Sequence, residues 1–302
     1  MIRLDASTVL LQWSVGGLLF LWVTCRHRKV GIGYGWLLRS TYIIMLIGAL
    51  VVGLLTKTVL AREIITTGIV IATAIPLLIS FLNRKNEEKN LNLNLDLVAP
   101  ILGIAALVVA ALDAGGPPAL AIARILIGAI FLGVVSDAML LGHWYLVQPG
   151  LVRSPLLELV RLTGIIWPFE LAVLLYPTGM ISVINGNIDD GYGGLLGWFW
   201  IACTVMTIIL VFVTRAALKE RQYSAVMAAT GLLYLAILTG FGMSRTESDR
   251  KLVTDIPGEM SKKCLGFEVR TVPEIWCTKN HVFSHTLHGV RNGARRPWWK
   301  HT

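Results

Sequence analysis

The chain has 302 residues, of which 55% are hydrophobic and 15% are charged. Soluble domains are about 45–50% apolar and about 25% charged, so this composition excludes an ordinary soluble, disordered or fibrous protein. The formal net charge of +9 would suit a nucleic-acid partner, but its distribution along the chain indicates a membrane protein instead.

A membrane-spanning helix needs about 20 mainly apolar residues, because each residue rises about 1.5 Å through a hydrocarbon core about 30 Å thick. Eight stretches of the chain meet this requirement. They are residues 6–25, 40–60, 64–83, 95–113, 118–147, 155–176, 194–214 and 224–243. The predicted fold class is therefore all-α: a polytopic integral membrane bundle of about eight transmembrane helices.

The first stretch is predicted to remain as a membrane helix rather than to be cleaved as a signal peptide. Its apolar run is about 20 residues long, whereas a signal core has about 7–15. The basic run Arg26-His27-Arg28-Lys29 follows it directly, as in a stop-transfer segment.

Glycines recur close together in several stretches, as in Gly16-Gly17 and in Gly128 with Gly133. Small residues allow membrane helices to approach each other closely. These positions are therefore candidates for close helix contacts.

The basic residues of the loops predict an orientation, because Lys and Arg resist translocation across a membrane. Loops after the first, third, fifth and seventh stretches hold eleven of them, and the alternate loops hold two. The eleven are Arg26, Arg28, Lys29, Arg39, Arg84, Lys85, Lys89, Arg153, Arg215, Lys219 and Arg221, and the two are Lys57 and Arg62. The odd-numbered loops are predicted to be cytoplasmic and both termini non-cytoplasmic, with the protein integral to the cell membrane.

Ionisable side chains inside the spans are costly, about 2.5–3.5 kcal/mol each on insertion scales, so each is a candidate functional residue. The fifth and sixth stretches contain Arg124, Asp137, Arg161 and Glu170. The short connection 148–154 makes these stretches antiparallel neighbours, and Asp137 and Arg161 then differ in depth by about 6 Å. One interpretation is a buried Asp137–Arg161 ion pair; another pairs Arg161 with Glu158 on the same helix.

The fifth stretch ends in the aromatic run His143-Trp144-Tyr145. Trp and Tyr concentrate at membrane interfaces because their rings are apolar and carry one polar group, so an interfacial belt is one interpretation. The other is a ligand site, since the imidazole of His143 can bind a quinone carbonyl or a haem iron. Haem is not favoured, because His27 is the only other histidine before residue 244. No metal site is predicted.

Glu170, in the sixth stretch, is the strongest functional candidate. No basic residue lies within two turns of it on its own helix, and Pro168 precedes it by two residues. Proline lacks an amide donor and frees a backbone carbonyl, so a helix kink at Pro168 would favour a polar pocket. Glu170 is expected either to stay protonated against a neighbouring helix or to act as a proton-relay, substrate-binding or quinone-contacting carboxyl group.

The last segment, 244–302, is predicted to be a weakly ordered, basic and polar tail. It holds eleven Lys/Arg and six Asp/Glu, and this excess of basic residues accounts for about half of the net charge of the chain. Cys264 and Cys277 are too far apart for a paired zinc-ligand motif. A disulfide between them is chemically allowed if the tail is exported.

The chain has no nucleotide-binding loop, catalytic triad or zinc-protease motif. The preferred function is a membrane subunit that handles a quinone-like electron carrier, with Glu170, Asp137, His143 and Tyr145 around one aromatic pocket. The first alternative is a proton-coupled small-solute transporter, in which Glu170 carries the proton and Pro168 marks a broken helix. The second is a structural or assembly protein. The lipid bilayer and other membrane subunits are the expected partners, and nucleic acid is not.

Overall fold

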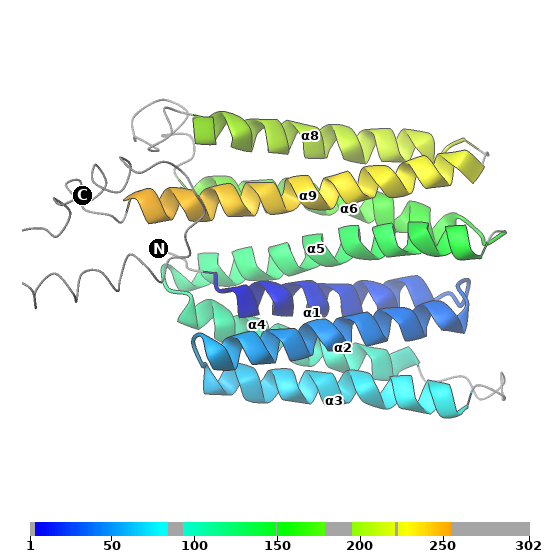
Figure 1. Ribbon diagram of the computed structural model, residues 1–302, viewed down its shortest axis with the longest axis horizontal. Helices are drawn as coiled ribbons and strands as arrows, with labels where there is room; N and C mark the ends of the chain where they lie inside the picture. The colour runs from blue at the N-terminus through cyan, green and yellow to red at the C-terminus, as the bar shows by residue number, and fades with distance from the viewer. Residues whose placement is uncertain (1–3, 84–92, 149, 179–194, 221–222, 255–302) are drawn as a thin grey trace, which may run out of the picture. The chain divides into compact units, whose positions relative to one another are not determined.

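The computed structural model describes residues 4–83, 93–148, 150–178, 195–220 and 223–254. These residues form α-helices and one short 3-10 helix, without a strand among them (Figure 1). The elements are α1 (Ala6–Cys25), α2 (Ile32–Leu55), α3 (Leu60–Leu82), η1 (Leu93–Leu97), α4 (Val98–Asp113), α5 (Pro118–Val147), α6 (Ser154–Thr178), α8 (Leu195–Ala217) and α9 (Tyr223–Thr254). The predicted all-α helical bundle is confirmed.

Two helices form the centre of the bundle. Helix α1 packs against α2, α4 and α5, and helix α5 also packs against α4, α6 and α9 (Figure 1). Helices α2 and α3 lie on one side of this centre, and α6, α8 and α9 lie on the other. Among the apolar helices that are long enough to cross a membrane, α1 and α5 are also the most buried.

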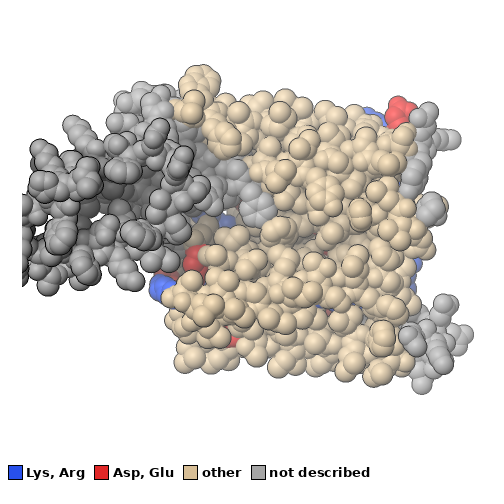
Figure 2. Space-filling view, in the orientation of Figure 1, with Lys and Arg blue, Asp and Glu red and all other residues tan. Residues whose placement is uncertain are grey.

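The outer surface of the bundle suits a lipid environment. Six segments are long and apolar enough to cross a membrane: α1, α2, α3, Asn94–Asp113, α5 and Gly197–Ala217. Large apolar side chains such as Leu55, Leu82 and Trp198 are at least 70% exposed on them. On the face shown in Figure 2, the coloured charged residues gather near the two ends of the helices and leave a broad band between them. The chain is therefore a multi-pass membrane protein by the length and composition of its helices.

Helices α6 and α9 are less apolar than these six segments. Helix α6 contains Glu158, Arg161 and Glu170, and α9 continues past residue 243 to Thr254. Residues 244–254, the first part of the predicted polar tail, are thus helical and continue α9. The remainder of that tail, with Cys264 and Cys277, lies outside the described residues.

Alternate connections lie at opposite ends of the bundle (Figure 1). The connections α1–α2, α5–α6 and α8–α9 share one end, which we call the basic end; its described residues include Arg26, Arg28, Lys29, Arg153 and Lys219. The connections α2–α3 and α4–α5 share the other, which we call the opposite end. Arg84, Lys85, Lys89 and Arg221 lie outside the described residues.

The beginning of α2 differs from the sequence-based prediction. The helix begins at Ile32 rather than at residue 40, because Tyr34 and Leu38 are completely buried against the bundle. The prediction of Arg39 as a loop charge is wrong. Arg39 belongs to α2, and its buried guanidinium donates hydrogen bonds of 3.0 and 2.6 Å to the two carboxylate oxygens of Asp96.

A glycine contact joins α1 to α5. A Cβ atom on Gly16 would lie 1.8 Å from the carbonyl oxygen of Ala129, and one on Gly133 would lie 2.2 Å from the carbonyl carbon of Gly16. The two backbones therefore touch, and no larger residue fits at either position. We call this contact the α1–α5 seam.

We predict that Gly16→Ala destabilises the protein by about 1–3 kcal/mol or more, because the added methyl group forces the two backbones apart. The matched control is Gly68→Ala on α3, where a Cβ atom meets no other atom within 4 Å. The measurement is the fraction of each variant that remains monodisperse after heating in detergent. Equal losses for the two variants would contradict the seam.

Candidate functional site

Asp137 forms a completely buried polar site near the basic end of the bundle core. Helix α5 supplies this carboxyl group, which is 0% exposed. The Thr24 hydroxyl donates to one carboxylate oxygen at 2.9 Å, and the Tyr42 hydroxyl donates to the other at 3.3 Å. The Tyr34 hydroxyl donates to the backbone carbonyl of Asp137 at 3.3 Å. Neutral hydroxyl groups from α1 and α2 therefore surround the carboxyl group.

The two pairings considered for Arg161 are wrong. Asp137 faces α1 and α2, whereas Arg161 lies exposed on α6 beside α8. Glu158 forms its ion pair with Arg26 at the end of α1. Within the described part of the chain, Arg161 has no ion pair.

Glu170 forms a second polar site, in the half of the bundle nearer the opposite end. Its side chain is 8% exposed, and Arg124 on α5 is 6% exposed. A Cβ atom on Gly128, one turn after Arg124, would lie 3.9 Å from both carboxylate oxygens of Glu170. The opposite charges of Glu170 and Arg124 attract each other across the α5–α6 interface.

The Glu170 carboxyl group is incompletely satisfied by its neighbours. Its Oε2 atom is buried and accepts no hydrogen bond in the described structure. The Gln12 amide lies near the same glycine, but it donates to the backbone carbonyl of Ile125 at 2.9 Å. Gly128 leaves space between these groups that a side chain would fill. Glu170 thus keeps a free acceptor inside the core.

The two carboxyl sites occupy different levels of the bundle. Asp137 follows Gly128 by nine positions on α5, which is about 14 Å along the helix axis at 1.5 Å per residue. The α1–α5 seam lies between these levels, because Gly16 contacts Ala129 and Gly133. The backbones are so close there that no water molecule fits between them.

The aromatic run at the end of α5 lies at the basic end. Tyr145 is 3% exposed, and its hydroxyl donates to the backbone carbonyl of Val152 in the α5–α6 connection. The ring of Trp144 lies 6.0 Å from that of Tyr34, between ring centres. His143 is exposed. The structure does not bring Glu170, Asp137, His143 and Tyr145 into one pocket.

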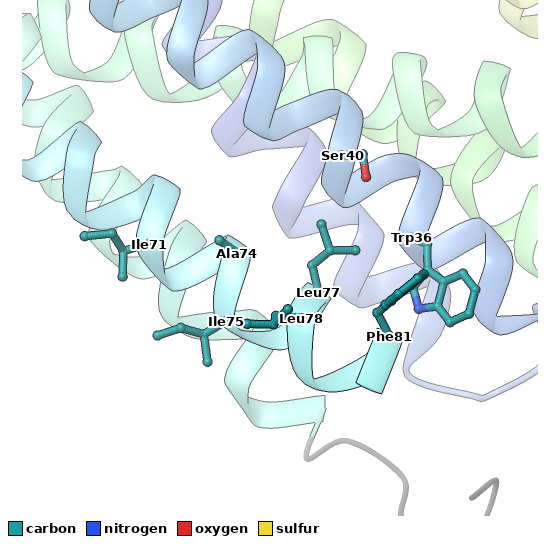
Figure 3. Close-up of a pocket in the computed structure, with 8 residues that line it drawn as sticks. All are labelled: Trp36, Ser40, Ile71, Ala74, Ile75, Leu77, Leu78 and Phe81. Atoms are coloured by element: carbon teal, nitrogen blue, oxygen red, sulfur yellow. The ribbon is translucent and has the colours of Figure 1, made fainter. Parts of the chain in front are cut away.

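An apolar groove of about 650 Å³ lies between α2 and α3 and opens to the outside of the bundle (Figure 3). Trp36 and Phe81 stand at one end of it, with ring centres 5.7 Å apart, and Ile71 lies at the other end. The hydroxyl of Ser40 is the polar side-chain group in its lining, apart from the Trp36 indole, which donates to Ser80 at 2.7 Å. None of the candidate carboxyl groups lines this groove.

Arg62 is the centre of a buried ion cluster at the opposite end, and its prediction as a loop charge is wrong. It lies in α3, is 1% exposed, and contacts Asp5 and Glu63 at 2.7 Å each. Thr8 accepts a further hydrogen bond from it at 3.2 Å. The adjacent Glu63 was the sequence signal for this cluster, because an Arg-Glu pair at the start of an apolar helix can enter the membrane as a neutral unit.

No protein-family model, curated protein or solved structure matches this chain. Among the described residues, no three His, Cys, Asp or Glu side chains come together as a metal site requires.

We predict that Arg62→Met destabilises the protein by about 3–5 kcal/mol, because it leaves Asp5 and Glu63 as uncompensated charges. The control is Lys57→Met, which breaks the Lys57–Asp113 pair at the same end. Lys57 is 62% exposed, so water takes the place of the lost partner. Its removal should cost about 0–1 kcal/mol. Free energies of unfolding in detergent would test this, and similar losses for both variants would contradict the cluster.

Proposed function

We propose that this protein is a proton-coupled transporter of a small solute, in which Glu170 takes up and releases the coupling proton. One observation carries the proposal: the Glu170 carboxyl group is buried beside Arg124, and its Oε2 atom accepts no hydrogen bond from the described residues. A charged group held this incompletely inside a membrane bundle is a functional candidate by default.

The neighbouring arginine suggests how a proton and a solute could be coupled. A carboxyl group at this depth avoids an uncompensated charge either by binding a proton or by facing a cation. Arg124 supplies that cation. A solute that carries a carboxylate would compete with Glu170 for Arg124, and Glu170 would then bind a proton. We therefore favour a small organic anion, carried together with a proton, as the solute.

Asp137 offers a second protonatable group on the way to the basic end. The α1–α5 seam separates it from Glu170 in this conformation. Transfer between the two levels along the α1–α5 interface therefore requires a movement of helices, as expected for alternating access. Helix α6 is the candidate moving element, because it carries Glu170 and because Pro168 removes one backbone hydrogen bond two residues earlier.

The orientation is part of this proposal. The basic end, with Arg26, Arg28, Lys29, Arg153 and Lys219, would face the cytoplasm according to the positive-inside rule. Both termini would then lie on the non-cytoplasmic side of the cell membrane, and Glu170 would lie in the outer half of the bundle.

A quinone-like electron carrier is the second candidate ligand. The observation that favours it is the groove between α2 and α3, which opens to the lipid and has Trp36 and Phe81 at one end. A quinone ring could stack on these aromatic side chains and accept a hydrogen bond from Ser40. In this role the protein would work with other membrane subunits that supply or accept the electrons.

We predict that Glu170→Gln reduces anion-dependent proton uptake at least roughly tenfold, because glutamine cannot bind or release the proton. The assay uses proteoliposomes with an internal pH-sensitive dye and a panel of small mono- and dicarboxylates. The matched control is Glu158→Gln on the same helix, which removes the ion pair with Arg26 at the basic end. Uptake by Glu170→Gln at the wild-type rate would overturn the proposal.

The quinone alternative predicts that a short-chain benzoquinone binds the purified protein and that Trp36→Ala weakens this binding at least roughly tenfold. The control is Trp198→Ala, since Trp198 is 70% exposed on α8 and away from the groove. Quinone extracted with the protein and measured by absorbance provides the second readout. Absence of quinone in the extract, together with equal binding by the two variants, would remove this alternative.

A further inference from the structure

A second groove, of about 630 Å³, lies between α6 and α8. Its lining runs along α6 from Val160 to Pro168 and along α8 from Ile208 to Arg215. Exposed apolar side chains border it, including Ile165, which is 50% exposed, and Phe212, which is 67% exposed. The groove therefore opens onto the surface that faces lipid.

Polar and apolar groups are separated along this groove. Helix α6 begins at the basic end and α8 finishes there, so Arg161 and Arg215 both lie toward that end. From Arg161 to Pro168 the groove extends about 10 Å deeper along α6, at 1.5 Å per residue. Apolar side chains dominate this deeper part. The groove thus has a cationic mouth and an apolar interior.

Among the described residues, neither arginine of the groove has an acidic partner. Neither Arg161 nor Arg215 forms an ion pair within the described structure, and no acidic residue lines the groove. Arg161 lies seven residues after the start of α6, at a depth of about 10 Å. An exposed arginine at that depth must extend toward the interface or find an anion. A phosphate group meets this need, because a guanidinium binds its oxygens in a bidentate manner.

We propose that this groove binds an anionic phospholipid from the leaflet at the basic end. Its phosphate lies between Arg161 and Arg215, and one acyl chain follows the groove toward Pro168. An anionic headgroup is preferred over a zwitterionic one, because choline or ethanolamine would bring a third positive charge to a mouth without any acidic side chain. The bound lipid would contact both α6 and α8. The position of α6, the helix that carries Glu170, would then depend on the lipid composition of the membrane.

The test is native mass spectrometry of the full-length, delipidated protein in mild detergent, with titration of phosphatidylglycerol and phosphatidylcholine of identical acyl chains. The wild type should bind phosphatidylglycerol at least roughly tenfold more tightly. The double variant Arg161→Gln/Arg215→Gln should lose this preference. Arg28→Gln/Lys219→Gln, which removes two charges from the same end but outside the groove, should keep it.

A variant that keeps both arginines tests the apolar part of the groove. Gly164 lines it, and a Cβ atom there would meet Val211 at an ordinary 3.5 Å. Gly164→Leu should therefore fold, fill the groove and weaken phosphatidylglycerol binding. Equal binding of the two lipids by the wild type would overturn the proposal, and this comparison needs no variant. So would a phosphatidylglycerol preference retained by the double variant, or binding of inorganic phosphate with the same affinity as the lipid.

Discussion

The scarcity of counter-charges inside a hydrocarbon environment is the constraint that organises this structure. Near the ends of the helices, buried arginines lie in direct contact with carboxylates: Arg62 with Asp5 and Glu63, and Arg39 with Asp96. Removing one partner of such a buried pair destabilises a fold. Deeper in the bundle the constraint is met incompletely, with hydroxyl groups around Asp137 and a facing arginine beside Glu170. An incompletely satisfied carboxyl group can change its protonation state at a lower cost in free energy. Glu170 is such a group.

The α1–α5 seam restricts how the two central helices can move relative to each other. Close backbone contact at Gly16 and Gly133 brings the two central helices together and closes the α1–α5 interface between the levels of Glu170 and Asp137. Helix α6 contacts both this centre and α8, and it carries Glu170 and Pro168 as well as the cationic mouth at Arg161. A buried carboxyl group, a proline inside the helix and the lining of an open groove therefore share one helix. Movement of α6 would affect all three together.

The length of the apolar stretches was enough to predict the helices. The fifth stretch, 118–147, agrees with α5 at both ends. The beginning of α2 could not be predicted in this way, because Arg39 ends the apolar run while its partner Asp96 is distant in sequence.

The partners of Asp137 and Glu170 depend on which helix faces meet, and a single sequence does not contain that information. Arg124 and Glu170 were each recognisable as costly residues. That they face each other, and that Asp137 turns toward Tyr34 and Tyr42, follows only from the packing.

The central claim is that Glu170 exchanges a proton while it is buried. Infrared difference spectroscopy of the protein in lipid measures this directly through the carbonyl stretch of protonated carboxyl groups. We predict a carboxyl band that changes reversibly with external pH in the wild type, is absent in Glu170→Gln, and is retained in Glu158→Gln. If the wild type and Glu170→Gln gave the same pH-dependent bands, Glu170 would hold one protonation state, and the account would be contradicted.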